Sequence, residues 1–339
     1  MYPLDGGRWG PTVRIGHLRD ELSALVELDV VDGYRGARRR RLVQYAVSGR
    51  LRGLDGIYVE SSTFLPAEAD VAFLGLARAL GIPVLTYVRD AYQLFGEEYP
   101  AASLRQRVGR AAYRPILTAL TAVSTRIAVP TRGLADAVLR DRSASAVLLP
   151  PGSPPPVEVP RAGDAGRLLF VGDARLPAHG ADRLIAAVSC ARERGAQIGL
   201  DLVTRAGQEP PGARPGWLRL HRAEGPAIHA LLGDVLATVI PRPRSPYNDL
   251  ALPIKLFDYL SYGRPLLVTD CREQAALVRA AGAGLVVGDS IEEIATGIEV
   301  LARATSGELD RWSAAATRAA RAASWRHRAE RIVELLVSR

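Results

Sequence analysis

Short apolar runs alternate with segments of helical period along the whole chain. In the first half, the apolar runs predict parallel strands and the intervening segments predict amphipathic helices. The strands are expected at 28–31, 56–60, 83–88, 126–129 and 146–149. The helices are expected at 12–26, 67–80, 102–119 and 132–140.

The second half repeats the alternation. Strands are expected at 167–171, 199–203, 218–221, 235–240, 265–269 and 284–287. Helices are expected at 180–194, 225–232, 253–262, 271–281 and 290–304, followed by a helical tail at 309–337. Strand–helix alternation at this spacing predicts parallel sheets covered by helices.

A proline-rich stretch, LLPPGSPPPVEVPRAGDAG at 148–166, separates the halves and excludes a helix or central strand there. We therefore predict an α/β protein of two Rossmann-like domains facing across a cleft. The boundaries are 1–150 for the first domain, 151–166 for the linker, 167–308 for the second domain and 309–339 for C-terminal helices that pack back toward the first domain. A Gly-rich loop at 5–10 opens the chain, so either the first sheet lacks its usual first strand or the true start lies upstream.

Composition adds two outliers. Lys and Arg together number 44, yet Lys255 is the only lysine, and Asn248 is the only asparagine. A compact ammonium and a planar guanidinium bind anions differently, so a lysine kept in an arginine-rich chain is a candidate ligand-binding group. The alternative is chance survival. The two cysteines lie in apolar surroundings without metal-binding spacing, and no apolar run reaches the roughly 20 residues that a membrane span needs. The N-terminus lacks an apolar signal core, which predicts a cytoplasmic protein.

The net charge of +8 favours an anionic partner. Basic residues cluster at Arg35, at 38–41, and at Arg50 and Arg52. The cluster is either a solvated helix face or a surface attracted to anionic lipid, which would place the protein at the inner face of the membrane. Nucleic acid is excluded as a partner because the chain has no aromatic RNA-binding signature, zinc-finger spacing or basic zipper.

The stretch around the lone lysine predicts an anion site. An apolar strand at 235–240 leads into a polar loop, and Pro253 suits the first turn of the helix that follows. Backbone N–H groups of the loop and the positive end of the helix favour a phosphate, to which Lys255 adds a full charge. Asp258, at i+3, could accept hydrogen bonds from a ribose. The alternative is an ordinary ion pair between these two side chains.

The segment around Lys255 resembles part of a known protein family. VIPRPRSPYNDLALPIKLFDYLSYGRPLLVTD, from Val239, resembles the donor-binding segment of GT-B glycosyltransferases, especially family 4. Weaker similarities follow in the right order at Asp5, Pro83, Arg167 and Ser324. The resemblance implies sugar transfer from a nucleotide-diphosphate sugar, with retention and without a metal or other cofactor. Asp173 and His179 stand where the family often has Arg and Lys, and Leu250 replaces the first of two acids.

The resemblance also implies roles for individual residues. It assigns catalysis to Lys255, Asp90 and Arg175. It assigns donor binding to Gly6, Gly7, Gly172, His179, Asn248, Asp249, Leu250, Ala251, Leu252 and Asp258. We expect a transferase that moves a sugar from a UDP- or GDP-sugar to a saccharide or lipid-linked acceptor. The alternatives are a nucleotide-sugar-binding partner without activity and a sugar-nucleotide epimerase.

Overall fold

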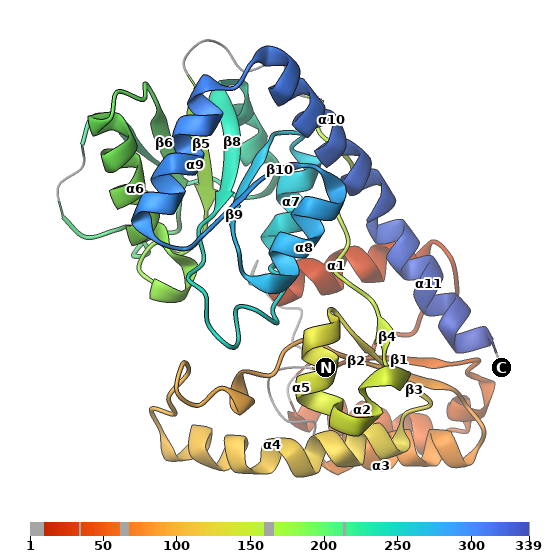
Figure 1. The fold of residues 1–339 in the computed structure, drawn as a ribbon. Coiled ribbons are helices and arrows are strands. Elements are labelled where there is room, and N and C mark those ends of the chain that lie inside the picture. The colour runs from red at the N-terminus through yellow and green to blue at the C-terminus, as the bar shows by residue number, and fades with distance from the viewer. Residues whose placement is uncertain (1–9, 34, 62–67, 159–165, 213–214, 339) are drawn as a thin grey trace. The chain divides into compact units, whose positions relative to one another are not determined.

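The computed structural model describes residues 10–33, 35–61, 68–158, 166–212 and 215–338 (Figure 1). The chain forms two compact units. The first comprises residues 1–152 and 325–339, and the second comprises 153–324.

The first unit is built on a parallel four-stranded sheet in the order β1-β2-β3-β4. Strand β2 is buried throughout, as expected for a central parallel strand covered on both faces. The strands are β1 (Ile57–Ser61), β2 (Val84–Val88), β3 (Arg126–Val129) and β4 (Val147–Leu148).

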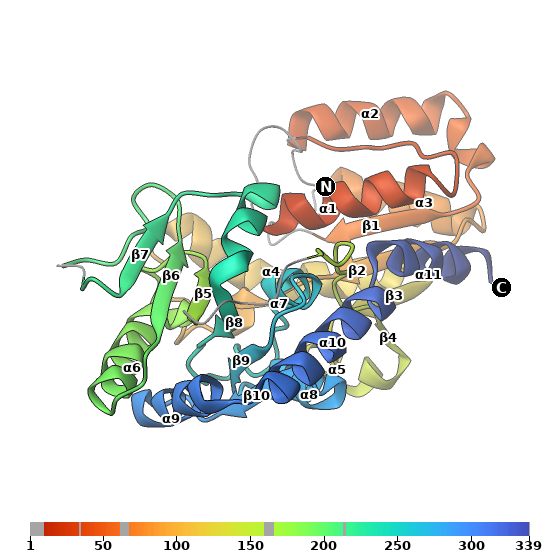
Figure 2. The same ribbon diagram turned by 90° about the horizontal axis from the view of Figure 1, so that it is seen from above.

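Helices cover both faces of this sheet. Helices α3, α4 and α5 lie in the connections between consecutive strands, whereas α1 and α11 pack against each other and α11 also contacts β1 and β2 (Figure 2). Helix α2 packs beside α3. The helices are α1 (Gly10–Ser23), α2 (Arg35–Val47), α3 (Glu68–Ala79), α4 (Leu104–Val123), α5 (Arg132–Leu139) and α11 (Trp325–Val337), with 3-10 turns η1 (Arg50–Gly53), η2 (Tyr92–Leu94) and η3 (Arg140–Ser145).

The second unit contains a parallel six-stranded sheet in the order β10-β9-β8-β5-β6-β7. The chain moves outward from β5 through β6 to β7, then returns to β8 and moves the other way. The order therefore reverses between β5 and β8, and ligands of such sheets bind beyond the strand ends at this point. The strands are β5 (Arg167–Val171), β6 (Gly199–Val203), β7 (Leu218–His221), β8 (Val235–Ile240), β9 (Leu266–Thr269) and β10 (Gly284–Val287).

Two apolar cores sandwich this sheet. One core joins α6 and α9 to side chains such as Phe170 and Leu200, and the other joins α7, α8 and α10 to side chains such as Leu169 and Val268. The helices are α6 (Ala181–Glu193), α7 (Ile254–Ser261), α8 (Arg272–Ala281), α9 (Ile291–Arg303) and α10 (Ser306–Ala322), with 3-10 segments η4 (Pro177–His179) and η5 (Gly225–Asp234).

One predicted strand is absent. Residues 28–31 form no strand, and Val30 and Val31 instead line a surface depression with side chains of α2, a helix that was not assigned from the sequence. Segment 225–232 is helical as predicted, as part of the 3-10 segment η5. The tail breaks at 323–324 into two helices.

The two C-terminal helices belong to different units. Helix α10 packs on α7 and α8 in the second unit, and α11 packs on α1 in the first. The expected return to the first domain therefore concerns α11 alone. Trp325 begins α11, is 4% exposed and stacks on His17, so it is a core residue. Among the described helices, none combines the length and the apolar character needed to cross a bilayer.

Candidate functional site

In the second unit, the ends of β5 and β8 lie close to the start of α7. Strand β5 ends at Val171, and the next residue, Gly172, has a φ of +152°. A Cβ built on Gly172 would lie 2.9 Å from the Nζ of Lys255 in the first turn of α7. Lysine and glycine from segments more than 80 positions apart in sequence therefore approach closely at the point where the strand order reverses.

Lys255 is half-buried and has no anion beside it. Its Nζ lies 4.9 Å from the centroid of the Phe170 ring. Among the described residues, the ammonium makes no hydrogen bond and no ion pair. Burial lowers the pKa of Lys255 from 10.5 to about 8, and the charge of Arg242 adds to this effect. The group is therefore a cation in a half-buried setting that disfavours its charge.

The alternative of an ion pair with Asp258 is excluded. The Asp258 carboxylate is not within 4.0 Å of the ammonium, and it accepts no hydrogen bond from the part of the chain that the structure describes. Burial raises the pKa of Asp258 from 3.8 to about 6, although Lys255 opposes this shift. The side chains of Lys255 and Asp258 are thus both left with unused hydrogen-bonding capacity.

Arg242 supplies a second positive charge that the sequence reasoning missed. It is 8% exposed, and its guanidinium donates to the Oδ1 of Asn248 and, at 3.4 Å, to the carbonyl of Ala251. Its charge lowers the pKa of both Lys255 and His179, so it faces the same space. The sequence did contain an indication of this residue, because Arg242 comes two residues after the carboxyl end of the buried strand β8.

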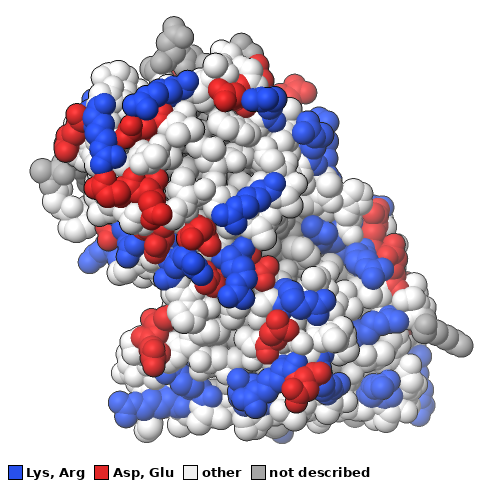
Figure 3. Space-filling view, in the orientation of Figure 1, with Lys and Arg blue, Asp and Glu red and all other residues white. Residues whose placement is uncertain are grey.

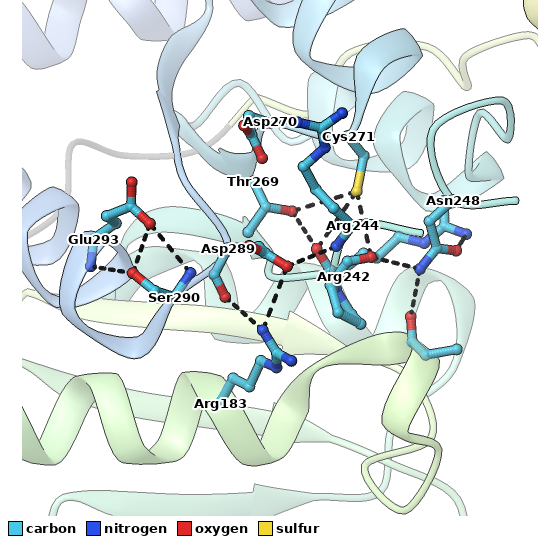
Figure 4. Close-up of polar contacts among 12 residues, drawn as sticks. Arg183, Arg242, Arg244, Asn248, Thr269, Asp270, Cys271, Asp289, Ser290 and Glu293 are labelled. Carbon is cyan, nitrogen blue, oxygen red and sulfur yellow. Dashed lines mark hydrogen bonds and ion pairs between the residues drawn. The ribbon is translucent and has the colours of Figure 1, made fainter. Parts of the chain in front are cut away.

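Asn248 holds the loop together rather than facing outward. It is 1% exposed, and its Nδ2 donates at 2.8 Å to the carbonyl of Pro243 and at 3.5 Å to that of Ala178 (Figure 4). Its oxygen accepts from Arg242. The backbone of Arg242 is fixed in turn by Thr269, whose hydroxyl donates at 2.6 Å to its carbonyl. The side chain predicted to bind the donor is therefore committed to positioning Arg242.

The remaining loop groups are also largely engaged. The N–H groups of Leu250 and Ala251, predicted to bind phosphate, both donate to the carbonyl of Tyr247 at 3.0 Å. Asp249 accepts from Arg244 at 2.8 Å and from the N–H of Arg272 at 3.2 Å, which ties the loop to the start of α8. Leu252 packs partly against the core beneath α7. These residues shape the loop, whereas α7 begins after Pro253 without a side-chain cap.

The loop after β5 carries less charge than the sequence suggested. The carboxylate of Asp173 accepts from the N–H of Arg175 at 2.9 Å, and the exposed Arg175 guanidinium turns to the carbonyl of Gly207 at 3.2 Å. The Nδ1 of His179 lies 3.0 Å from the carbonyl oxygen of Asp173. Burial, helped by the charge of Lys255, lowers the pKa of His179 from 6.5 to about 4. His179 is therefore neutral at pH 7.

Gly180 explains how these loops pack so closely. Its φ is +72°, and an added Cβ would lie 1.8 Å from the carbonyl oxygen of Pro241. Only glycine tolerates both this backbone conformation and this approach. The η4 turn can therefore rest directly on the segment that carries Arg242.

The first unit contains the remaining candidate residues. Asp90 follows β2 at its carboxyl end, and its Oδ2 accepts from the Nε of Arg89 at 2.9 Å. The hydroxyl of Tyr113 donates to the Asp90 carbonyl at 3.1 Å. Gly6 and Gly7 lie outside the described residues. Within the described ranges, no group of His, Cys, Asp and Glu side chains is arranged to hold a metal.

Comparisons with known proteins identify the fold. No protein-family description and no curated protein sequence matches the chain. Among solved structures, it is similar to sucrose-phosphate synthase from Thermosynechococcus elongatus, with a TM-score of 0.61 and 14% identity over 98% of this chain and 94% of that one. OtsA without ligand gives a TM-score of 0.60 and 11% identity over 96% and 85%.

A third similar structure is a UDP-forming α,α-trehalose-phosphate synthase from Burkholderia xenovorans in complex with glucose-6-phosphate. Its TM-score is 0.58, with 10% identity over 96% of this chain and 77% of that one. Each likeness spans both units. At such identities the likeness concerns the fold alone. It confirms the predicted class, an α/β protein with two Rossmann-like units of the GT-B type.

Proposed function

We propose that the chain is a glycosyltransferase that takes a sugar from a UDP- or GDP-sugar. The observation that carries this proposal is the half-buried Lys255 ammonium, which lacks an acceptor and lies beside Gly172 and Arg242 at the reversal point of the second sheet. Two cations at a helix N-terminus suit a diphosphate, because charge, helix dipole and backbone N–H groups act on it together.

The chemistry needs positive charge more than a strong base. When the bond between the sugar C1 and the diphosphate breaks, negative charge develops on the leaving phosphate. Lys255 and Arg242 are held in place to stabilise that charge before the reaction begins. The acceptor oxygen forms the new bond to C1, and its proton passes to the leaving phosphate, which is consistent with transfer with retention and without a metal. Asp258 would accept hydrogen bonds from the ribose hydroxyls.

The acceptor is proposed to be a saccharide, a sugar phosphate or a lipid-linked glycan. The similar structures are described as trehalose-phosphate and sucrose-phosphate synthases, one of them holding glucose-6-phosphate. Their acceptor chemistry supports including a sugar phosphate among the candidates. Asp90, at the carboxyl end of β2, would serve the acceptor side, as strand ends do in such sheets.

The test begins with ligand-induced stabilisation. UDP, GDP and their sugars should raise the melting temperature, since a ligand at 100 times its dissociation constant adds about 2.7 kcal/mol. K255M and R242M should lose this effect, whereas R318M, which removes an exposed cation from α10, should keep it. Wild-type protein should then release nucleotide from the stabilising donor when a suitable acceptor is present. Stabilisation of K255M and R242M equal to that of wild type would refute the proposed site.

One observation favours a second function, a nucleotide-sugar-binding protein without transfer activity. The loop after β5 contributes the acid Asp173 and the neutral His179, rather than the two cations that the resembled family often has there. Stabilisation by a donor that depends on Lys255, with no nucleotide release in any acceptor panel, would favour this second function. Release without an acceptor and with a changed sugar would indicate an epimerase.

A further inference from the structure

Helix α4 of the first unit presents an apolar stripe to solvent. Leu104 is 75% exposed and Val108 is 60% exposed, and Ala111 continues the stripe one turn further. Spacing of i, i+4 and i+7 places all three on one face of a helix. Leu104 and Val108 lie on neighbouring turns, so their exposed side chains form one continuous apolar strip on the helix.

The stripe lies directly opposite the face that packs on the sheet. Leu104 and Val108 each precede a buried residue, Tyr113 and Leu117, by nine positions. Nine residues correspond to about two and a half turns, or half a rotation. The stripe therefore contributes nothing to the core of the first unit, and its exposure is not a by-product of packing at the edge of the core.

Basic side chains border the stripe without acidic neighbours on the helix. Helix α4 contains Arg105, Arg107, Arg110 and Arg114 and no Asp or Glu. Arg110 donates to the carbonyl of Tyr99 and anchors the preceding loop. The side chains of Arg105, Arg107 and Arg114 make no hydrogen bond or ion pair with the described residues. In the space-filling view, basic side chains gather along the lower edge, where α4 lies (Figure 3).

The position of these arginines along the helix is electrostatically unfavourable. Arg105 and Arg107 lie in the first turn of α4, where the helix dipole favours anions and disfavours cations. The helix is capped there by the neutral pair Ser103 and Gln106, with no acid in the first turn. An external anion at this end would interact favourably with both the guanidinium groups and the dipole.

We propose that this stripe and its arginines, residues 104–114 of α4, form a docking surface for a bilayer that contains anionic lipid. The Leu and Val side chains enter the headgroup region, and the arginines beside them contact lipid phosphates. Amphipathic helices with this arrangement lie in the plane of the interface. The proposal does not rest on the proposed transferase activity, because it concerns only the first unit and is measured by binding.

A bilayer fits these observations better than nucleic acid or a protein. Exposed aliphatic side chains gain little from stacked bases, which pair with aromatic and planar groups. A protein interface is usually poor in uniform charge at its core and rich in aromatic anchors. Helix α4 instead combines a narrow aliphatic stripe with charge of a single sign.

The experiment is flotation of the full-length protein with vesicles. One set contains phosphatidylcholine alone, and the other contains phosphatidylcholine mixed with phosphatidylglycerol. Wild-type protein should float with the mixed vesicles. R105Q/R107Q should bind about 25-fold more weakly, because each arginine near an anionic surface accounts for about a fivefold difference. L104S/V108S should bind more weakly as well, with the same charge as wild type.

Controls separate this surface from a general charge effect. R318Q/R321Q removes two exposed arginines from α10 in the second unit and should float like wild type. All variants should keep the wild-type melting temperature, since the changed side chains are exposed. The proposal fails if R318Q/R321Q loses as much binding as R105Q/R107Q, or if L104S/V108S floats like wild type. Binding of an oligonucleotide that depends on Arg105 and Arg107 but not on Leu104 would assign the surface to nucleic acid instead.

Discussion

Replacing Lys255 by methionine should stabilise the protein without ligand while abolishing donor binding. Methionine is similar in length, flexible and apolar, so it can occupy the space beside Phe170. The pKa of Lys255 falls from 10.5 to about 8 on folding. A shift of one unit corresponds to about 1.36 kcal/mol, so keeping the ammonium charged in the folded protein costs about 3 kcal/mol at pH 7. Because Lys255 is half-buried and partly hydrated, we expect K255M to gain about 1–3 kcal/mol.

The stability difference between K255M and wild type should also depend on pH. Between pH 8 and 10.5 the lysine is protonated in the unfolded chain and increasingly neutral in the folded one. The unfolded state then binds more protons, so the stability of wild type should rise with pH in this window. The same side chain is absent from K255M, so the advantage of the variant should disappear by about pH 10.5.

Urea unfolding of both proteins across this pH range measures the difference directly. R318M is the matched control, because it removes an exposed cation and should change stability by less than about 0.5 kcal/mol. A K255M variant that is less stable than wild type at pH 7 would show that the ammonium has an internal partner, and the reasoning about an anion site would be refuted. An advantage of K255M that does not change with pH would show that it comes from packing rather than from the charge.

Three further predictions concern the neighbours of Lys255. G172A should weaken donor binding about tenfold and cost about 1–2 kcal/mol of stability, measured by thermal shift and urea unfolding, because its Cβ would crowd Nζ at a φ of +152°. N248A should cost about 2 kcal/mol of unfolding free energy, since it leaves the buried Arg242 without its side-chain acceptor, and donor affinity should fall with it. D258N should be more stable than wild type by about 1–3 kcal/mol at pH 7. Between pH 3.8 and about 6 the folded wild type binds the Asp258 proton more tightly than the unfolded chain does, so only wild type should lose stability as the pH rises through this range. Equal pH profiles of the two proteins would contradict the pKa shift.

Much of the fold could be predicted because parallel sheets leave a strong signature. Buried strands such as β3 and β6 are short apolar runs between helical segments, so their bounds follow from the sequence. The prediction failed at 28–31, where Val30 and Val31 have strand-like composition but pair with no strand of the described ranges. It also failed at α2, whose arginine run hides a buried position. Arg38 is 7% exposed and donates to both carboxylate oxygens of Asp70 at 2.7 Å, a tertiary contact that no local pattern indicates.

The candidate site was predicted in part, for a different reason. Rare residue types drew attention to Lys255 and Asn248, but rarity does not distinguish a group that faces a ligand from one that holds a loop. The structure places Lys255 at Gly172 without a partner and turns Asn248 inward. Arg242 was overlooked because it is one arginine among many, and only its burial sets it apart.

The roles of the lone lysine and the lone asparagine are linked through Arg242. An amide can accept from a guanidinium and also donate to a carbonyl, as Asn248 does with Arg242 and Pro243, whereas an aspartate would face the carbonyl of Pro243 with two acceptor oxygens. The amide therefore holds Arg242 without neutralising it, whereas a carboxylate would cancel the charge. A fixed cation next to Lys255 adds electrostatic repulsion to the protein without ligand. A diphosphate removes this repulsion by pairing with both groups. Selection for anion binding at this point would keep Asn and Lys together, even in a chain that uses arginine almost everywhere else.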